Sequence, residues 1–388
     1  MKMTKKYSQN IKNDYVFFVL YDIIFLVIKM GALDNISRIN YRNDAVMKLI
    51  KLYQYKGKEF YYHNILKADR NYIAKQTVAK DTFYVAKLMN LNVSENRMRL
   101  VINKNSAPKT SEEKVVANLK RIFEITCEKA HEFELIPNGV LSLASRLYKD
   151  VKQIKFETQK VAYQVNLLTE FKSVSKREDL KILLDKYIDL LSTEQYENVS
   201  LVVNFYIDFI NIKPFKDESE IVGLLLLYVL LFRESFDINI YESFFEFIYN
   251  NYDEFKQHVI AANYNWEAGF SHTEPLTDFF INHMLANYDK LEKLIRDYEY
   301  DSKLNKGDNI ENTIYRVPQI FTKEDIRAKH PFVSDSTINR TLQRLRDEGK
   351  ISPLGTGRSA KWMRVTHTPE RFNPYEQLDI FGLSDDDE

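Results

Sequence analysis

The sequence predicts a mainly α-helical protein in which a large helical domain is followed by a small domain of mixed α and β structure. Three observations support this prediction. The chain has 388 residues, which suits one large domain plus a smaller one. It contains 25 Tyr and 25 Phe but only 10 Gly and 9 Pro, a composition typical of helices around an aromatic core. Apolar residues recur at helical spacing from about Met47 to Arg296, and the pattern changes after that.

The charge and cysteine content narrow the classes of function. Lys and Arg total 55 and Asp and Glu total 55, so the net charge is zero and any signal for nucleic-acid binding must be local. The single cysteine, Cys127, excludes a disulfide framework and a thiolate metal site. It fits a reducing compartment, and we therefore expect a cytoplasmic protein.

Residues 1–45 are expected to form an N-terminal helical segment. The apolar run YVFFVLYDIIFLVIK, from Tyr15 to Lys29, follows a lysine-rich start and resembles a signal anchor. Asp22 interrupts the run, which is also short for a bilayer. We therefore expect a buried amphipathic helix and no membrane partner.

Residues 46–300 are predicted to form the large helical domain. Stretches such as EEKVVANLKRIFEITCEKA and NVSLVVNFYIDFI place apolar residues at helical spacing. In KNSAPKTSEEK a proline and a serine precede acidic residues, so a helix is expected to open near Ser111. No sustained strand alternation is predicted in this domain.

Three further segments complete the chain. Residues 301–308 are polar, contain glycine and show no periodicity, as expected of a linker. Residues 309–366 are predicted to form the small domain, with two short helices and then ISPLGTGRSAKWMRV, where extended runs flank a glycine-rich hairpin tip. Residues 367–388, which end in LSDDDE, are expected to form a flexible acidic tail.

The small domain begins as a helix, a turn and a second helix. Thr322 and Asp325 have the spacing of a capping box for the first helix, and Ser334 or Asp335 can cap the second. The run HPFVSDST superficially resembles an active site, but His330 falls in the turn between the helices. We therefore expect it to have a structural role.

The second helix of this pair is amphipathic. Its apolar face is formed by Ile338, Leu342 and Leu345. Its polar face and the hairpin supply the residues that we predict to bind DNA: Ser336, Thr337, Arg340, Arg344, Arg358 and Lys361. Arginine can pair with guanine, short hydroxyl side chains can bind phosphates, and the hairpin residues form a basic wing.

The charge of the small domain agrees with this prediction. Between residues 309 and 366 there are eleven Lys or Arg and six Asp or Glu, a net charge of +5 within a neutral chain. Over about sixty residues the arrangement resembles a winged helix-turn-helix, which implies double-stranded DNA as the partner. The alternative is a small protein-docking module with a solvated charged face.

The stretch NVSLVVNFYIDFINIKPFKDESEIVGLLLLYVLLF, residues 198–232, reads as a helix, a polar loop and a very apolar helix. It resembles the centre of the Fic (Fido) family, whose loop carries His-Pro-Phe-x-Asp/Glu-Gly-Asn-Gly-Arg-x-x-Arg. The stretches at 102–124, 241–262 and 277–295 resemble the flanking helices of that family. The resemblance covers residues 46–300, and family members often carry a C-terminal winged helix.

The resemblance implies transfer of a nucleotide monophosphate, usually AMP from ATP with magnesium, to a protein hydroxyl. The position of the catalytic histidine is occupied by Lys213, which is protonated near neutral pH and cannot accept a proton. Asp217 keeps the position of the acidic residue that holds the metal. Pro214 and Phe215, which shape and pack the loop, also match the family motif.

The phosphate-binding part of the motif has been replaced. Glu218, Ser219 and Glu220 stand in place of Gly-Asn-Gly, where backbone N–H groups would surround phosphate oxygens. The two glutamates suit a helix start and would repel ATP. Both motif arginines are replaced, by Ile221 and Leu224. These changes predict a vestigial motif with no catalytic residue, no metal and no cofactor.

Many family members carry an inhibitory helix with Ser/Thr-x-x-x-Glu-Gly/Asn, whose glutamate pairs with the second motif arginine. The stretch LNVSEN offers Glu95 and Asn96 as a remnant of this motif, with Leu91 at the Ser/Thr position. The arginine that this glutamate would bind is absent as well.

The leading hypothesis is a bacterial-type DNA-binding regulatory protein whose Fic-like domain has lost nucleotide transfer and serves for homodimerisation or ligand sensing. The alternative is a protein adenylyltransferase that uses ATP and magnesium in an unconventional loop, with a buried, neutral Lys213 as the base. A third possibility is a protein-docking adaptor. The sequence leaves the three open.

The acidic tail contains a short candidate binding motif. Gln377, Leu378, Asp379, Ile380 and Phe381 resemble the peptide with which bacterial proteins dock into the groove of the replicative sliding clamp. The alternative is that Leu378, Ile380 and Phe381 fold back onto the protein.

Overall fold

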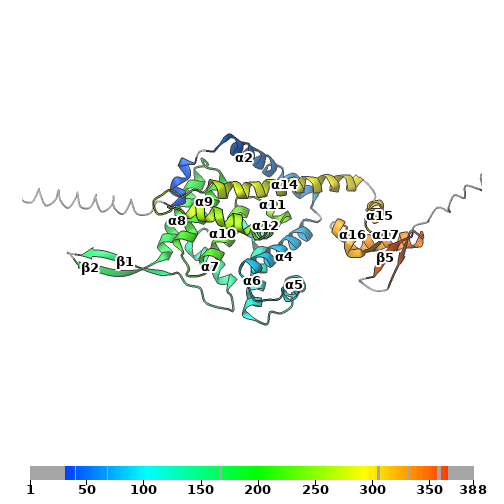
Figure 1. Ribbon diagram of the computed structural model, residues 1–388, viewed down its shortest axis with the longest axis horizontal. Coiled ribbons are helices and arrows are strands. Elements are labelled where there is room, and N and C mark those ends of the chain that lie inside the picture. Colours follow the sequence, from blue (N-terminus) through cyan, green and yellow to red (C-terminus); the bar gives the residue numbers. More distant parts are fainter. Residues whose placement is uncertain are drawn as a thin grey trace, which may run out of the picture. The chain divides into compact units, whose positions relative to one another are not determined.

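The computed structural model describes residues 31–39, 41–67, 69–165, 168–303, 306–330, 333–355 and 360–365. The chain divides into two compact units, Met1–Ile295 and Arg296–Glu388, which are considered separately below. Helices dominate and the sheets are small, so the mainly α prediction is confirmed (Figure 1). Within the described residues, no helix has the length and apolar character needed to cross a membrane. The apolar run at 15–29 and the tail from 367 lie outside the described residues.

The first unit contains the large helical domain. Its elements are η1 (Ala32–Arg38), α2 (Asn43–Lys56), α3 (Glu59–Ile65), α4 (Arg70–Leu88), α5 (Glu95–Lys104), α6 (Ser111–Lys129), η2 (Ala130–Glu132), α7 (Pro137–Leu147), β1 (Thr158–Val165), β2 (Leu168–Ser175), α8 (Lys176–Ser192), α9 (Asn198–Ile212), α10 (Ser219–Arg233), α11 (Ile238–Tyr241), α12 (Phe244–Asn250), α13 (Tyr252–Asn263) and α14 (Glu274–Lys303), the last of which continues into the second unit.

Helices α9 and α10 form the centre of the first unit (Figure 1). Both are mainly apolar, and every residue between Val199 and Ile210 and between Val222 and Phe232 is buried, as expected for core helices. Gly223 lets the two helices come close. A Cβ atom at this position would lie 2.9 Å from a ring carbon of Phe209 and 3.0 Å from the Cγ2 of Ile210.

The predicted helix start near Ser111 is confirmed. Helix α6 begins at Ser111, and Thr110 is its N-cap, because the Thr110 hydroxyl accepts a hydrogen bond of 3.2 Å from Glu113 N. The Glu113 carboxylate in turn accepts hydrogen bonds from Arg97 and from Lys109 N, at 2.9 and 2.6 Å. The bond with Arg97 is the main reason why the pKa of Glu113 falls to about 2.

The large domain contains two strands, although the sequence shows no sustained strand alternation there. Strands β1 and β2 pair antiparallel, from Thr158 opposite Ser175 to Val165 opposite Leu168. The stretches TQKVAYQV and LTEFKSVS place β-branched and aromatic residues at alternate positions, which is the strand signal. Each run is short, so helical periodicity before and after it obscured the alternation.

Of the predicted linker at 301–308, residues 301–303 and 306–308 are helical. Helix α14 continues to Lys303 and α15 begins at Lys306. This segment has no proline, and its one glycine is Gly307. The boundary between the units falls between Ile295 and Arg296, inside α14.

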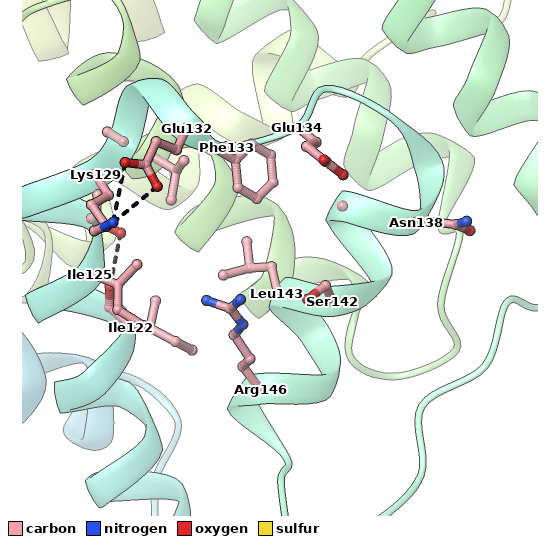
Figure 2. A pocket seen from close by; sticks show the side chains of 14 residues that line it. Ile122, Ile125, Lys129, Glu132, Phe133, Glu134, Asn138, Ser142, Leu143 and Arg146 are labelled. Atoms are coloured by element: carbon pink, nitrogen blue, oxygen red, sulfur yellow. Dashed lines mark hydrogen bonds and ion pairs between the residues drawn. The ribbon is translucent and has the colours of Figure 1, made fainter.

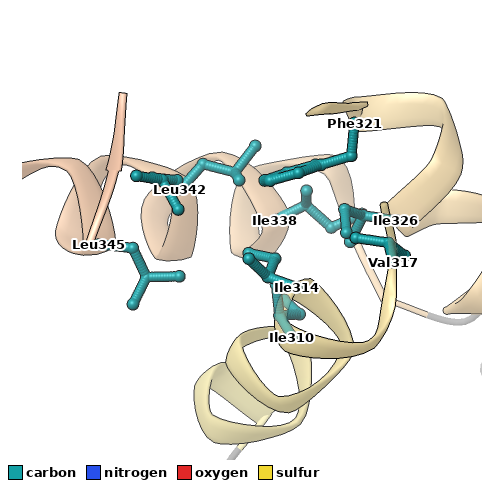
Figure 3. Packing of buried hydrophobic residues seen from close by; sticks show 9 residues of the cluster. Ile310, Ile314, Val317, Phe321, Ile326, Ile338, Leu342 and Leu345 are labelled. Atoms are coloured by element: carbon teal, nitrogen blue, oxygen red, sulfur yellow. The ribbon is translucent and has the colours of Figure 1, made fainter. Parts of the chain in front are cut away.

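The second unit has mixed α and β structure, as predicted. Its elements are α15 (Lys306–Arg316), β3 (Ile320–Thr322), α16 (Lys323–Lys329), α17 (Asp335–Asp347), β4 (Ile351–Pro353) and β5 (Lys361–Arg364). The three strands form an antiparallel sheet in the order β3-β5-β4. Figure 3 shows the core that holds the helices together, which includes Ile314, Phe321, Ile326, Ile338, Leu342 and Leu345.

The predicted caps of the two short helices are present. Thr322 and Asp325 form a reciprocal capping box at the start of α16. The Ser334 hydroxyl accepts a hydrogen bond of 3.2 Å from Thr337 N, so Ser334 is the N-cap of α17 and Asp335 is its first residue. Ile338, Leu342 and Leu345 are buried, which confirms the predicted apolar face.

Candidate functional site

The loop between α9 and α10 has a tightly packed first half. Helix α9 ends at Ile212, and Lys213 takes a left-handed conformation with φ 50° and ψ 65° that turns the chain. Pro214 and Phe215 are buried, and the Phe215 ring stacks on Phe156 with the ring centroids 5.4 Å apart. The two residues that match the family motif and shape the loop therefore pack into the core.

The loop also supports the base of the β1–β2 hairpin. Glu157 N donates a hydrogen bond of 2.8 Å to the carbonyl of Pro214, and Lys176 N donates one of 2.9 Å to the carbonyl of Glu157. The Lys176 ammonium donates a hydrogen bond of 2.6 Å to the carbonyl of Ile212. Two carbonyl groups at the start of the loop are thus bound by residues that flank the hairpin.

Side chains of the chain itself fill the second half of the loop. Phe215 N donates a hydrogen bond of 2.9 Å to Ser219 Oγ, and the Ser219 hydroxyl donates back to the carbonyl of Phe215. Ser219 is buried, so its hydroxyl is committed to this closed turn. Ser219 stands where the Fic motif has asparagine.

Glu218 is held by a partner outside the loop. Its carboxylate forms an ion pair with Lys152, whose ammonium lies 4.4 Å from the centroid of the Tyr148 ring. Burial, and then the charge of Glu218, raises the pKa of Tyr148 to about 12. The Glu218 side chain does not cap α10, and Glu220 is exposed. Glu220 lies in the first turn of α10, where its charge suits the helix start as expected, whereas the Glu218 carboxylate is bound by Lys152.

The remaining positions of the loop differ in exposure. Lys213 and Asp217 are exposed, so the buried lysine that an unconventional site requires is not present. Leu224 is buried and Ile221 is half-buried at the positions of the two phosphate-binding arginines. Among the residues that the structure describes, no group of three His, Cys, Asp or Glu side chains could hold a metal ion.

The two residues predicted to be a remnant of an inhibitory motif lie at the start of α5. Glu95 and Asn96 are exposed, and Glu95 forms an ion pair of 2.6 Å with Lys87 on α4. Helix α5 packs against α4 and α6. The partner of Glu95 is therefore a residue of α4 and not a residue of the α9–α10 loop.

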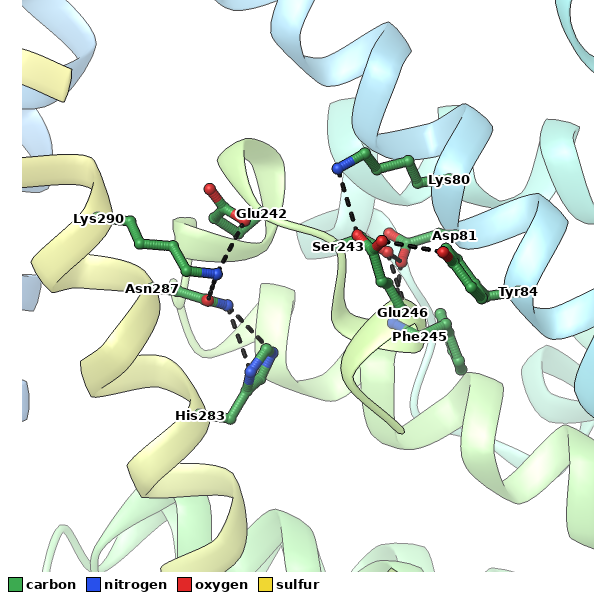
Figure 4. A network of polar contacts seen from close by, with 10 residues as sticks. All are labelled: Lys80, Asp81, Tyr84, Glu242, Ser243, Phe245, Glu246, His283, Asn287 and Lys290. Carbon is green, nitrogen blue, oxygen red and sulfur yellow. Dashed lines mark hydrogen bonds and ion pairs between the residues drawn. The ribbon is translucent and has the colours of Figure 1, made fainter. Parts of the chain in front are cut away.

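A polar cleft of about 570 Å³ between α4, α12 and α14 is a second place where charged side chains gather. Lys80 pairs with Glu246 at 3.2 Å, and Lys290 pairs with Glu242 at 3.5 Å (Figure 4). These four charges thus neutralise one another in pairs.

Buried polar groups beside this cleft support the fold. The Asp81 carboxylate accepts hydrogen bonds from Ser243 Oγ at 2.5 Å and from Phe245 N at 3.0 Å, which fixes the start of α12 (Figure 4). Burial raises the pKa of Asp81 to about 7. The His283 ring stacks on Phe247 with centroids 3.9 Å apart, and burial lowers the pKa of His283 to about 3.

In the second unit, α17 presents an exposed polar face. Ser336 and Arg340, both predicted to bind DNA, are exposed, and so are Asn339 and Gln343. The last two were missed, although spacings of three and four residues along a helix place them on this face. Thr337 is half-buried and its hydroxyl lies 2.9 Å from Ser334 Oγ, so it takes part in the helix cap.

Arg344, which is also predicted to bind DNA, takes part in an ion-pair network. Its guanidinium donates hydrogen bonds to Glu311 on α15 at 2.8 Å and to Glu348 at 2.9 Å. Lys350 joins the same network with an ion pair of 2.6 Å to Glu311. The long side chain of Arg344 reaches α15, which packs along α17, and the helix period alone does not reveal this.

The hairpin is described in part. Lys361 is exposed at the start of β5, whereas Arg358 lies outside the described residues. Arg364 donates hydrogen bonds to the carbonyls of Tyr315 and Val317, at 2.7 and 3.0 Å, and has a structural role. His330 is buried, and its Nε2 lies 2.5 Å from the hydroxyl of Thr313 on α15, which fits the expected structural role.

No protein-family model matches the chain, and no curated protein is significantly similar to it. Among solved structures, it is similar to two structures of Fic-1 from C. elegans. One is 12% identical with a TM-score of 0.46 and covers 65% of this chain and 72% of that one. The other is 13% identical with a TM-score of 0.47 and covers 64% and 71%. A Fic domain containing signaling protein from Bacteroides thetaiotaomicron is 14% identical, with a TM-score of 0.46 and coverage of 64% and 97%.

Proposed function

We propose that this protein is a DNA-binding regulator in which the second unit is a winged helix and the first is a Fic-like domain without nucleotide-transfer activity. The observation that supports DNA binding most directly is the exposed face of α17. The order of elements, α15-β3-α16-α17-β4-β5, agrees with the order expected of a winged helix, and in the proposed role α17 is the recognition helix that enters the major groove.

The residue types on this face suit the edges of base pairs. Arg340 can donate two hydrogen bonds to guanine, and Asn339 and Gln343 can each make a bidentate pair with adenine. Ser336, near the N-terminus of α17, and Lys361, at the start of β5, suit phosphate groups. This division predicts that the helix reads sequence and that the hairpin adds affinity.

The contacts of the α9–α10 loop support the absence of nucleotide transfer. That chemistry depends on positioned charge around the phosphates. Here Glu218 is paired with Lys152, the Ser219 hydroxyl is committed to Phe215, and Leu224 is buried where an arginine would be needed. The exposed Asp217 is the one acidic residue that matches the motif.

Selection of bound sequences from random duplex DNA tests the DNA-binding proposal with the full-length protein. Arg340→Ala should relax the base preference at one position by about 1–3 kcal/mol. Lys361→Ala should weaken binding to all DNA sequences alike. It should also reduce the slope of log affinity against log salt concentration by about one. Arg344→Ala is a matched control on the same helix and should keep the base preference. A selected site with twofold symmetry would support a homodimer.

Failure of the full-length protein to enrich any sequence, or to bind duplex DNA in a salt-dependent way, would refute the proposal and favour the protein-docking adaptor. Equal effects of Arg340→Ala and Arg344→Ala on base preference would refute the role assigned to α17.

A labelled-nucleotide assay tests the alternative, a protein adenylyltransferase that uses ATP and magnesium. We expect no thermal shift with ATP and magnesium and no labelling of the protein itself or of lysate proteins. Lys213→His should also remain inactive, because the phosphate-binding residues are still missing. Labelling by the wild-type protein that Lys213→Ala abolishes would establish the alternative.

A further inference from the structure

A pocket of about 520 Å³ lies in the first unit between the C-terminal half of α6, η2 and α7, with Val229 of α10 at its base. Figure 2 shows the side chains that line it. The volume falls within the range of about 300–1,000 Å³ that small-molecule sites occupy. Val229 lies in the C-terminal half of α10, whereas the loop described above precedes the N-terminus of that helix. The two sites are therefore distinct.

The walls of the pocket are mostly apolar. The apolar lining residues are Ile122, Ile125, Ala130, Phe133, Leu143 and Val229. Gly139 allows the turn before α7 to close over one end, because a Cβ atom there would collide with the carbonyl of Glu134. An apolar body of limited length therefore fits between α6 and α7.

One cation in this pocket, the exposed Arg146, has no partner among the residues that the structure describes. The Arg146 guanidinium forms no hydrogen bond and no ion pair with any described residue, and Figure 2 shows it projecting between α6 and α7 beside Leu143. The other cation, Lys129, pairs with Glu132 at 3.2 Å, so these two charges cancel. Glu134 also lines the pocket, and Figure 2 shows it on the far side of Phe133 from Arg146.

We propose that this pocket binds a small carboxylate with an apolar body, such as a medium-chain or aromatic carboxylic acid. The planar guanidinium of Arg146 matches a carboxylate with two parallel hydrogen bonds. The apolar walls bury the rest of the ligand. A nucleotide or a free phosphate would leave these walls without an apolar partner and would place several negative charges beside one arginine and Glu134.

Calorimetric titration of the full-length protein with octanoate and with 1-octanol tests this proposal. The two probes share the same chain and differ in charge. The wild-type protein should bind octanoate about tenfold more tightly than 1-octanol, as expected for a charge-assisted pair. Arg146→Gln should remove this preference and leave the affinity for 1-octanol within about twofold.

Two further variants separate the pocket from other surfaces. Ser142 is an exposed lining residue of α7, so Ser142→Trp should fill the pocket and weaken both probes by about tenfold or more. Arg121 is exposed on α6 outside the pocket, so Arg121→Gln should change neither affinity. The absence of octanoate binding to the wild-type protein, or binding unaffected by Arg146→Gln, would overturn the proposal. Either result would leave the DNA-binding proposal intact, because that proposal depends on the second unit.

Discussion

The Asp208 carboxylate holds the start of the described chain against the core, and its removal should destabilise the first unit strongly. Asp208 lies on α9 and is buried. It accepts hydrogen bonds from Ala32 N, from Leu33 N at 3.0 Å and from the Trp266 indole at 2.6 Å. Gly31 fits closely against it, because a Cβ atom there would lie 2.5 Å from Asp208 Oδ1.

The expected cost follows from these three donors. Asp208→Ala leaves Ala32 N, Leu33 N and the Trp266 indole without an acceptor, and each buried orphan donor costs about 1–3 kcal/mol. Helix η1 can move away from α9, so water can reach some of these donors. We therefore expect the free energy of unfolding to fall by about 3–5 kcal/mol in total. Asp208→Asn keeps one acceptor oxygen but turns an NH₂ group toward a donor, so it should cost less.

The pH dependence gives a second, independent expectation. Burial raises the pKa of Asp208 to about 6, although the hydrogen bonds from Leu33 N and Trp266 oppose this. The pKa of Asp208 is higher in the folded than in the unfolded state. Its contribution to the free energy of unfolding is therefore fully present below about pH 4 and is lost as the pH rises through 6. Two pKa units correspond to about 3 kcal/mol. Asparagine does not titrate, so the deficit of Asp208→Asn should shrink by about 3 kcal/mol between pH 4 and pH 8.

Urea unfolding followed by tryptophan fluorescence measures both quantities. The chain has two tryptophans, and Trp362→Phe leaves Trp266 as the reporter in the first unit. Asp44→Asn, which changes an exposed carboxylate on α2, is the matched control and should have little effect. A cost below about 1 kcal/mol for Asp208→Ala would refute the reasoning, and so would an Asp208→Asn deficit that is equal at pH 4 and pH 8.

Four further predictions concern other parts of the chain. Ser219→Ala should cost about 1–2 kcal/mol in urea unfolding, because it removes the acceptor of the buried Phe215 N; no change would show that the loop does not depend on this bond. Arg344→Ala should lower the thermal stability of the second unit by at most about 1 kcal/mol, since the pair with Glu311 is partly exposed; a larger loss would contradict this. Burial lowers the pKa of His283 to about 3, so its stability contribution is complete above pH 6.5 and is lost on acidification. The stability of His283→Phe relative to the wild type should therefore rise by up to about 5 kcal/mol between pH 6.5 and pH 3, and a constant difference would refute this. A fluorescent peptide of residues 371–388 should bind a bacterial sliding clamp through QLDIF and be displaced by unlabelled peptide; absence of displaceable binding would rule the motif out.

The parts of the fold that the sequence predicts are those set by local signals. Helix α6 begins where a proline and capping residues precede apolar periodicity, and the caps Thr322 and Ser334 are in place. The apolar face of α17 also follows from its period, because Ile338, Leu342 and Leu345 recur at three and four residues.

The parts that were missed depend on interactions between distant segments. The β1–β2 hairpin is stabilised by pairing between strands, and neither short run is distinctive alone. The helical period places Arg344 with Arg340, yet Arg344 pairs with Glu311 on α15, which only the tertiary packing of the second unit brings near. The same holds for the pocket beside Arg146, whose walls come from four separate elements.

The motif positions in the α9–α10 loop differ in what the fold requires of them. Phe215 stacks on Phe156, and the carbonyl of Pro214 accepts a hydrogen bond from Glu157 N at the base of the hairpin. These two residues match the family motif and have packing roles that need no nucleotide. At the positions that would contact phosphate, Ser219 and Leu224 are buried in contacts within the unit. Under the proposed function, restoring a single catalytic residue would leave these packed side chains in place of phosphate-binding groups, so several positions would have to change together before transfer could occur.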